Sequence, residues 1–184
     1  MNWNEYQQQA LTTAIYPLKR ELEYTTFGLC SEIGEVGLAY LDGKLNEWGF
    51  SNKLAQNVLK EAGDGYWYIA AVADALNVPL QHIVDNYTAG VVETYSSRGY
   101  TVVQLNGAAA EIAGVVKKAI RDNDGFLTDA GQEKIKKHLG TTLVLLNNLV
   151  ELFGSSPEGV TANNLNKLAD RKARGVLQGS GDNR

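Results

Sequence analysis

Apolar residues recur at three- and four-residue spacing along most of this 184-residue chain, as at Ile33 and Val36 and again at Tyr66 and Ile69. That spacing places side chains on one face of an α-helix, so the pattern predicts helices throughout. The first four expected helices cover approximately residues 4–23, 26–41, 53–77 and 80–97. The sequence therefore predicts an all-α fold.

Two features interrupt this helical pattern. Pro17 is expected to end or kink the first helix, because proline lacks the backbone N–H that a helix interior needs. The segment RGYTVVQLNG, residues 98–107, breaks the apolar spacing and has the composition of a short strand. Because one isolated strand is not stable alone, we expect this segment to be an extended linker.

The composition excludes several classes of protein. The chain can bury a sizeable core without disulfides, and its single cysteine, Cys30, cannot form an internal one, which favours a reducing cytoplasm. The first residues lack the basic and apolar regions of a signal peptide, and no apolar run approaches the roughly 20 residues that cross a membrane. The net charge of −4 argues against general nucleic-acid binding. We expect a cytoplasmic protein that binds neither membrane nor nucleic acid.

The second half of the chain resembles the first. Three segments of the first half resemble three segments of the second half, in the same order. The first pair begins at Gly28 and Gly107, the second pair begins at Glu61 and His138, and the third pair ends at Gly99 and Gly175. The positions in these pairs differ by 79, 77 and 76 residues. Nearly constant offsets predict an internal duplication, with one copy in residues 1–99 and the other in residues 100–184. The alternative is that helices joined by similar loops look alike by chance.

Two pairs of acidic residues interrupt the apolar faces of the second and third expected helices. Glu32 and Glu35 are three residues apart, as are Glu61 and Asp64, so each pair projects from one face of its helix. If the two helices pack antiparallel, the pairs face each other. The second copy lacks most of these acids, so the sequence predicts one site and not two.

Four carboxylates at close range repel one another, by on the order of 3 kcal/mol for two charges 5 Å apart at an effective dielectric constant of 20. Protons or lysines could neutralise them, but Mg²⁺ is the best partner because it prefers oxygen ligands. Nearby glycines are expected to leave room for ions and a polyphosphate, and these are Gly34, Gly37, Gly63 and Gly65. A solvated helix face is the alternative.

The acid pairs form the pattern E-x-x-E, loop, E-x-x-D, and the aromatic residues Trp67 and Tyr68 follow it. With the segments at residues 6–17 and 164–184, this pattern resembles the MazG-like family of all-α nucleoside triphosphate pyrophosphohydrolases. The resemblance implies a helical bundle that forms homo-oligomers. Because the acids lie in the first copy and the basic tail lies in the second, we expect the two copies to pack as an internal pseudo-dimer.

The resemblance also implies an activity. Family members cleave a nucleoside triphosphate between its α- and β-phosphates, which yields a nucleoside monophosphate and pyrophosphate. By that likeness the four acids form the catalytic site and hold Mg²⁺ or Mn²⁺. One of the acids or a metal-bound hydroxide is expected to accept the proton of the attacking water, and Glu32 is preferred although the spacing does not exclude Glu35. Small phage-type members often act on deoxynucleotides, so a dNTP is the expected substrate and dGTP is the first to test.

Other residues are candidates for binding the substrate. Cations hold phosphates, an asparagine reaches metal or sugar, and an aromatic ring stacks on a base. The candidates are Lys44, Asn86, Lys167, Arg171, Arg174 and Trp67. A solvated helix end explains the cations equally well, and core packing explains the tryptophan.

Two other functions are alternatives to a pyrophosphohydrolase. A carboxylate-bridged di-iron bundle requires Glu-x-x-His on two helices, and this motif does not occur in the sequence. A non-catalytic helical protein that binds a nucleotide or another partner stays open as the alternative.

Overall fold

The structure is a computed structural model that describes residues 2–46, 52–90 and 97–179; the side chains of residues 43–46 and of residue 52 lie outside the described part. Over these ranges the chain forms seven α-helices, one 3₁₀ turn and no strand, which confirms the all-α prediction. The elements are α1 (Trp3–Leu11), η1 (Leu18–Arg20), α2 (Glu21–Asn46), α3 (Asn52–Ala75), α4 (Leu80–Tyr87), α5 (Arg98–Asn123), α6 (Asp129–Leu152) and α7 (Pro157–Ala173).

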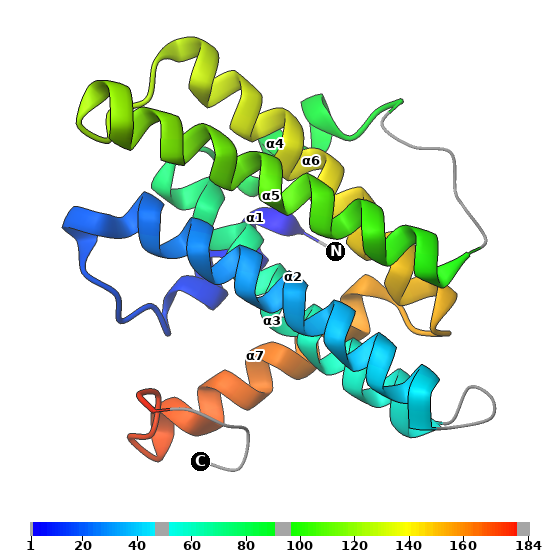
Figure 1. Cartoon of the computed structure of the whole chain (residues 1–184). Coiled ribbons are helices and arrows are strands. Elements are labelled where there is room, and N and C mark those ends of the chain that lie inside the picture. Colours follow the sequence, from blue (N-terminus) through cyan, green and yellow to red (C-terminus); the bar gives the residue numbers. More distant parts are fainter. Residues whose placement is uncertain (1, 47–51, 91–96, 180–184) are drawn as a thin grey trace.

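Four long helices form the body of the molecule. Figure 1 shows α5 and α6 as one antiparallel pair and α2 and α3 as another, and the pairs join where α2 packs on α5 and α3 on α6. The shorter helix α1 packs against α3 and α4, and α7 lies across α3. The side chains between these layers form one apolar core, in which Leu29, Ile33, Ile69 and Leu143 are fully buried.

The prediction that residues 98–107 form an extended linker is wrong, because this segment is the first part of helix α5. The Ser97 hydroxyl caps the helix by accepting a hydrogen bond from the backbone N–H of Tyr100. Thr101, Val102 and Leu105 are buried in the bundle. Burial of this face outweighs the modest preference of β-branched residues for strands, which is worth only a few tenths of a kcal/mol per residue.

Other boundaries also differ from the prediction. The first helix ends at Leu11, well before Pro17, and α2 begins at Glu21. Helix α4 ends at Tyr87 and is shorter than expected. No described helix combines the length and the hydrophobicity that crossing a membrane requires.

The order of helices in the two halves is the same. The helices α2, α3 and α4 begin at residues 21, 52 and 80, and α5, α6 and α7 each begin 77 residues later, at 98, 129 and 157. The third helix of each half packs on the opposite half, since α7 contacts α3 and α4 contacts α6. The duplication itself stays a prediction, but this reciprocal packing decides which residues reach the acids.

Glycines permit both of these crossings. A Cβ at Gly63 in α3 would lie 3.1 Å from Asn164 of α7, and a Cβ at Gly140 in α6 would overlap the Tyr87 carbonyl of α4. The members of each contact correspond, because Gly140 follows Gly63 by 77 residues and Asn164 follows Tyr87 by 77 residues. A side chain at either glycine would push the crossing helix away.

Candidate metal centre

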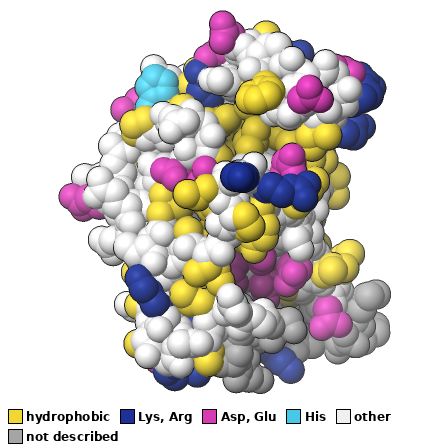
Figure 2. All heavy atoms as spheres, turned by 90° about the vertical axis from the view of Figure 1, so that its left-hand side faces the viewer, with side chains coloured by type: hydrophobic (Ala, Val, Ile, Leu, Met, Phe, Trp, Pro, Cys, Tyr) yellow, Lys and Arg dark blue, Asp and Glu magenta, His cyan; other side chains and the backbone are white. Residues whose placement is uncertain are grey.

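The structure brings the four predicted acids to one cleft. Glu32 and Glu35 project from α2, and Glu61 and Asp64 project from α3, into a cleft of about 560 Å³. Carboxylate oxygens of Glu32, Glu61 and Asp64 lie within 4.8 Å of one another. Glu35 lines the same cleft in a more exposed position. In Figure 2, acidic side chains gather in a hollow that hydrophobic side chains border. The two pairs therefore face each other, as their spacing predicts.

Close packing of α2 on α3 places these acids. A Cβ at Gly65 of α3 would lie 3.1 Å from the side chain of Ile33 on α2, so the glycine lets the two helices approach. Gly63 and Gly37 likewise face side chains of neighbouring helices, and only Gly34 of these four has open space beside it. The expectation that all four leave room for a ligand is therefore wrong, because three of them serve helix packing.

The electrostatics of the cleft favour added positive charge. Burial, and to a lesser extent the carboxylates of Asp64, Glu35 and Glu61, together raise the pKa of Glu32 from 4.5 to about 7, while Lys167 opposes them. A carboxylate whose pKa is raised by burial and by like charges is destabilised in its ionised form. A bound cation would remove this penalty.

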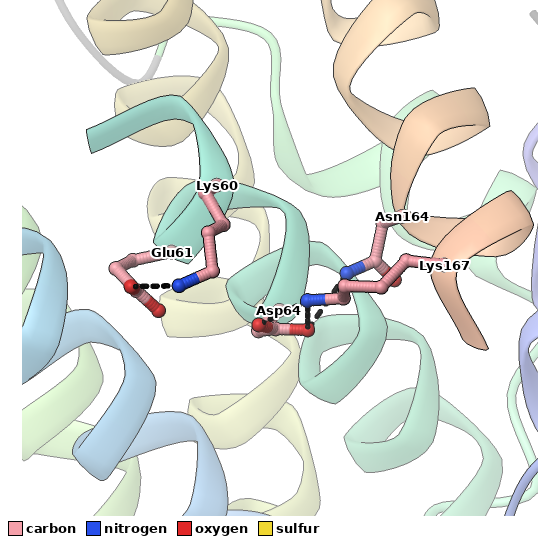
Figure 3. A network of polar contacts seen from close by, with 5 residues as sticks. All are labelled: Lys60, Glu61, Asp64, Asn164 and Lys167. Carbon is pink, nitrogen blue, oxygen red and sulfur yellow. Dashed lines mark hydrogen bonds and ion pairs between the residues drawn. The ribbon is translucent and has the colours of Figure 1, made fainter. Parts of the chain in front are cut away.

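Two lysines and one asparagine contact the acids from outside the cleft (Figure 3). The Lys167 ammonium group lies 2.8 and 2.6 Å from the two carboxylate oxygens of Asp64, and the Asn164 amide donates to Asp64 over 2.7 Å. Lys60 lies 3.2 Å from an oxygen of Glu61. Among the described residues, Glu32 and Glu35 have no ion pair. Half of the acid cluster is therefore neutralised by protein cations.

The predicted substrate-binding residues divide into two groups. Lys167 contacts Asp64, and Arg171 lines the cleft although only 5% of its surface is exposed. Trp67 also lines the cleft, but it is 8% exposed, and its indole N–H donates to the Ala10 carbonyl (2.9 Å) and to the Thr13 hydroxyl (3.0 Å). Trp67 is therefore held in the core, and little of its ring can stack on a base.

Two candidates do not line the cleft, and a third lies outside the described side chains. Asn86 is exposed on α4 and donates to the His82 carbonyl over 2.9 Å, so its placement at the site is wrong. Arg174 pairs with Asp170 on the surface and does not line the cleft. The side chain of Lys44 lies outside the described residues. Asn86 does not reach the acids because α4 packs on α6. Helix α7 instead packs on α3 and brings Asn164 to the acids.

An aromatic wall lines the cleft beside the acids, and the sequence indicated only one of its three members, Tyr68. Tyr16, Tyr24 and Tyr68 line the cleft, and the ring centres of Tyr16 and Tyr24 are 5.2 Å apart with 30° between their planes. Tyr24 is 44% exposed. Tyr16 comes from the irregular segment between α1 and η1, which has no periodic pattern to place it. Such a wall can receive a flat apolar group.

Two buried polar atoms near the acids support a bound ligand or water. The Tyr6 hydroxyl and the Asn164 carbonyl oxygen are buried and have no hydrogen-bond partner among the described residues. Burial and the charge of Asp64 both raise the pKa of Tyr6. An unpaired buried polar group costs about 1–3 kcal/mol, which a bound water or ligand would offset. The three residues that could hold a cation, Glu32, Glu61 and Asp64, offer only carboxylate oxygens, and these suit a hard divalent cation.

Comparison with known proteins finds a phage relative. The chain is 41% identical over 96 residues to the gene 37 protein of Mycobacterium phage L5, and the aligned part makes up 52% of this chain and 84% of the relative. No family model matches the chain, and no solved structure matches it. The relative's name states no activity. The chain therefore belongs to the same family as the gene 37 protein of Mycobacterium phage L5.

Proposed function

We propose that the protein is a metal-dependent nucleotide pyrophosphohydrolase of the MazG-like type, which converts a dNTP or NTP to the monophosphate and pyrophosphate. The observation that carries this proposal is the cluster of three carboxylate oxygens within 4.8 Å of one another, in a cleft that also holds an arginine. Glu32, Glu61 and Asp64 would hold Mg²⁺ or Mn²⁺, with Glu35 beside them. The cation would supply charge for the phosphates and would lower the pKa of bound water.

The other residues of the cleft suit a nucleotide. The guanidinium group of Arg171 can hold two phosphate oxygens in fork geometry, and Lys167 adds a second positive charge. The wall formed by Tyr16, Tyr24 and Tyr68 offers a place for the base. The two cations come from α7, whereas Tyr16 precedes η1 and Tyr24 and Tyr68 lie on α2 and α3.

The attacking water needs a proton acceptor within hydrogen-bond reach. Glu32 and Glu35 both line the cleft without an ion pair among the described residues, so both carboxylates are candidates to accept this proton. A cation bound to Glu32 would keep its carboxylate ionised and engaged. Glu35 would then be the acceptor.

Incubation with a panel of dNTPs and NTPs and either Mg²⁺ or Mn²⁺ tests this proposal. We expect a monophosphate and pyrophosphate in equal amounts, with dGTP among the first substrates to test. Glu35→Gln should abolish turnover while the helical circular dichroism stays unchanged. The matched control is Glu111→Gln, at an exposed position of α5, which should retain activity. Release of orthophosphate alone, or no turnover with any nucleotide, would reject the proposal.

One observation favours the alternative of a non-catalytic nucleotide- or partner-binding protein. Lys60 and Lys167 already neutralise two of the four acids without any metal. A purely binding protein would bind dNTP equally well in EDTA and in Mn²⁺, whereas the enzyme should bind it more tightly with the cation. Equilibrium binding of a non-hydrolysable dNTP analogue under both conditions separates the two functions.

We also infer that residues 1–99 and 100–184 are two copies of one unit, packed as an internal pseudo-dimer. The equal offset of 77 residues between helix starts and the reciprocal packing of α4 and α7 support this inference. The phage relative, most of which aligns with about half of this chain, is consistent with a single unit. We expect a fragment that ends at Gly99 to fold poorly, because it lacks nearly all of α5 and the whole of α6 and α7. A stable, active monomer of that fragment would contradict the pseudo-dimer.

A separate measurement, size-exclusion chromatography with light scattering, tests whether whole chains associate further.

A further inference from the structure

A second cavity of about 300 Å³ lies between α3 and α7, adjacent to the acid cleft. Its lining differs in charge from that of the cleft. Two lysines and several neutral polar side chains line it, together with apolar groups, and no acidic side chain is among its lining residues. The charged and polar residues are Gln56, Lys60, Ser155, Asn163, Asn164 and Lys167.

Ion pairs form the wall between the two cavities. Lys60 and Lys167 line the second cavity, yet their ammonium groups contact Glu61 and Asp64, which line the acid cleft (Figure 3). Each lysine therefore pairs with an acid of the cleft and also lines a cavity that has no acidic side chain. Asn164 is also shared, because its amide donates to Asp64 while its buried carbonyl oxygen lacks a partner among the described residues.

We propose that this second cavity binds a phosphate anion of the pyrophosphate class, and that a cation in the acid cleft strengthens the binding. A divalent cation would neutralise Glu61 and Asp64 in place of the lysines, whose ammonium groups could then turn toward the anion. The amides of Asn163 and Gln56 would donate to other phosphate oxygens. The anion site rests on the charges of the lining, and only the choice of pyrophosphate rests on the proposed function.

Calorimetric titration of inorganic pyrophosphate into the full chain, in EDTA at an ionic strength of about 0.15 M, tests the position of the site. Asn163 and Asn166 are both exposed on α7, but only Asn163 lines the cavity. Asn163→Glu should weaken binding by about tenfold or more, because it places a negative charge beside the anion. Asn166→Glu makes the same change in net charge and should leave binding within about twofold. Equal effects of the two substitutions, or no binding to the wild type, would overturn the proposal.

The coupling between the two cavities has a test that needs no metal. Asp64→Asn removes the carboxylate charge that holds Lys167, as a cation would, so pyrophosphate in EDTA should bind this variant about fivefold or more tightly than the wild type. Glu61→Gln makes the equivalent change at Lys60 and serves if the first variant does not fold. Unchanged affinity in the variant that folds would refute the coupling.

Two further titrations identify the anion and separate this proposal from the enzyme. A deoxynucleoside monophosphate that bound more tightly than pyrophosphate, with the same sensitivity to Asn163→Glu, would overturn the choice of pyrophosphate. The titrations require no turnover. Pyrophosphate binding with the predicted pattern in a protein that hydrolyses no dNTP would therefore reject the proposed function and leave the anion site intact.

Discussion

The substitution Glu32→Gln is expected to stabilise the protein in the absence of metal. Burial and neighbouring carboxylates raise the pKa of Glu32 from 4.5 to about 7 in the folded state. The folded state therefore binds this proton more tightly than the unfolded state does. As the pH rises from 4.5 through 7, the folded state loses stability, because the carboxyl group must ionise beside other acids. Glutamine has no proton to lose and escapes this cost.

The size of the effect follows from the same difference in pKa. The difference between 4.5 and about 7 corresponds to roughly 3 kcal/mol if all of it opposed folding. Because solvent reaches part of the side chain and screens its charge, we expect about 1–2 kcal/mol above pH 7. For a chain of this length, that free energy raises the Tm by about 2–8 °C.

Thermal unfolding in EDTA at pH 4.5 and at pH 8 measures this effect. The Tm of Glu32→Gln should exceed that of the wild type at pH 8 and approach it at pH 4.5. Glu111→Gln removes one negative charge at an exposed position of α5 and is the matched control. An equal rise in the Tm of both variants, or no rise for Glu32→Gln at pH 8, would refute the electrostatic reasoning. Saturating Mn²⁺ should reverse the order, since a cation at about 100 times its Kd stabilises the wild type by about 2.7 kcal/mol.

Three further predictions concern the substrate contacts and the packing. Arg171→Gln should raise the KM for a dNTP about tenfold while Arg174→Gln leaves it unchanged, because only Arg171 lines the cleft; steady-state kinetics of both variants decides this. Removal of residues 175–184 should raise the KM more than it lowers the Tm, because Leu177, Gln178 and Gly179 line the cleft; an unchanged KM would show that this segment does not contact the substrate. Gly28→Ala should destabilise the protein by about 1–3 kcal/mol because its Cβ would overlap the Tyr68 ring, whereas Gly34→Ala, which has open space, should stabilise it by up to about 1 kcal/mol; urea unfolding measures both changes.

The acid cluster could be predicted from the sequence because its geometry is mostly local. Residues three apart on a helix share a face, so the spacing of Glu32 and Glu35, and of Glu61 and Asp64, already directs each pair to one side. The two helices are consecutive and joined by a short connection, which leaves antiparallel packing as the simple arrangement. The all-α class follows in the same way, because helical periodicity depends only on near neighbours.

Contacts between distant segments decided the rest of the site. Tyr87 and Asn164 occupy equivalent positions in the two halves, and Asn86 is adjacent to Tyr87, yet nothing local indicates that α7 packs on α3 while α4 packs on α6. Residues 98–107 are helical because burial against other helices outweighs their own weak preference.

The sequence by itself determined the helices and the directions of their acids, because both depend on spacing along one helix. The tertiary structure alone decided which asparagine, which cations and which aromatic rings meet those acids. It also created the second cavity between α3 and α7, because neither helix encloses a space until the other lies across it.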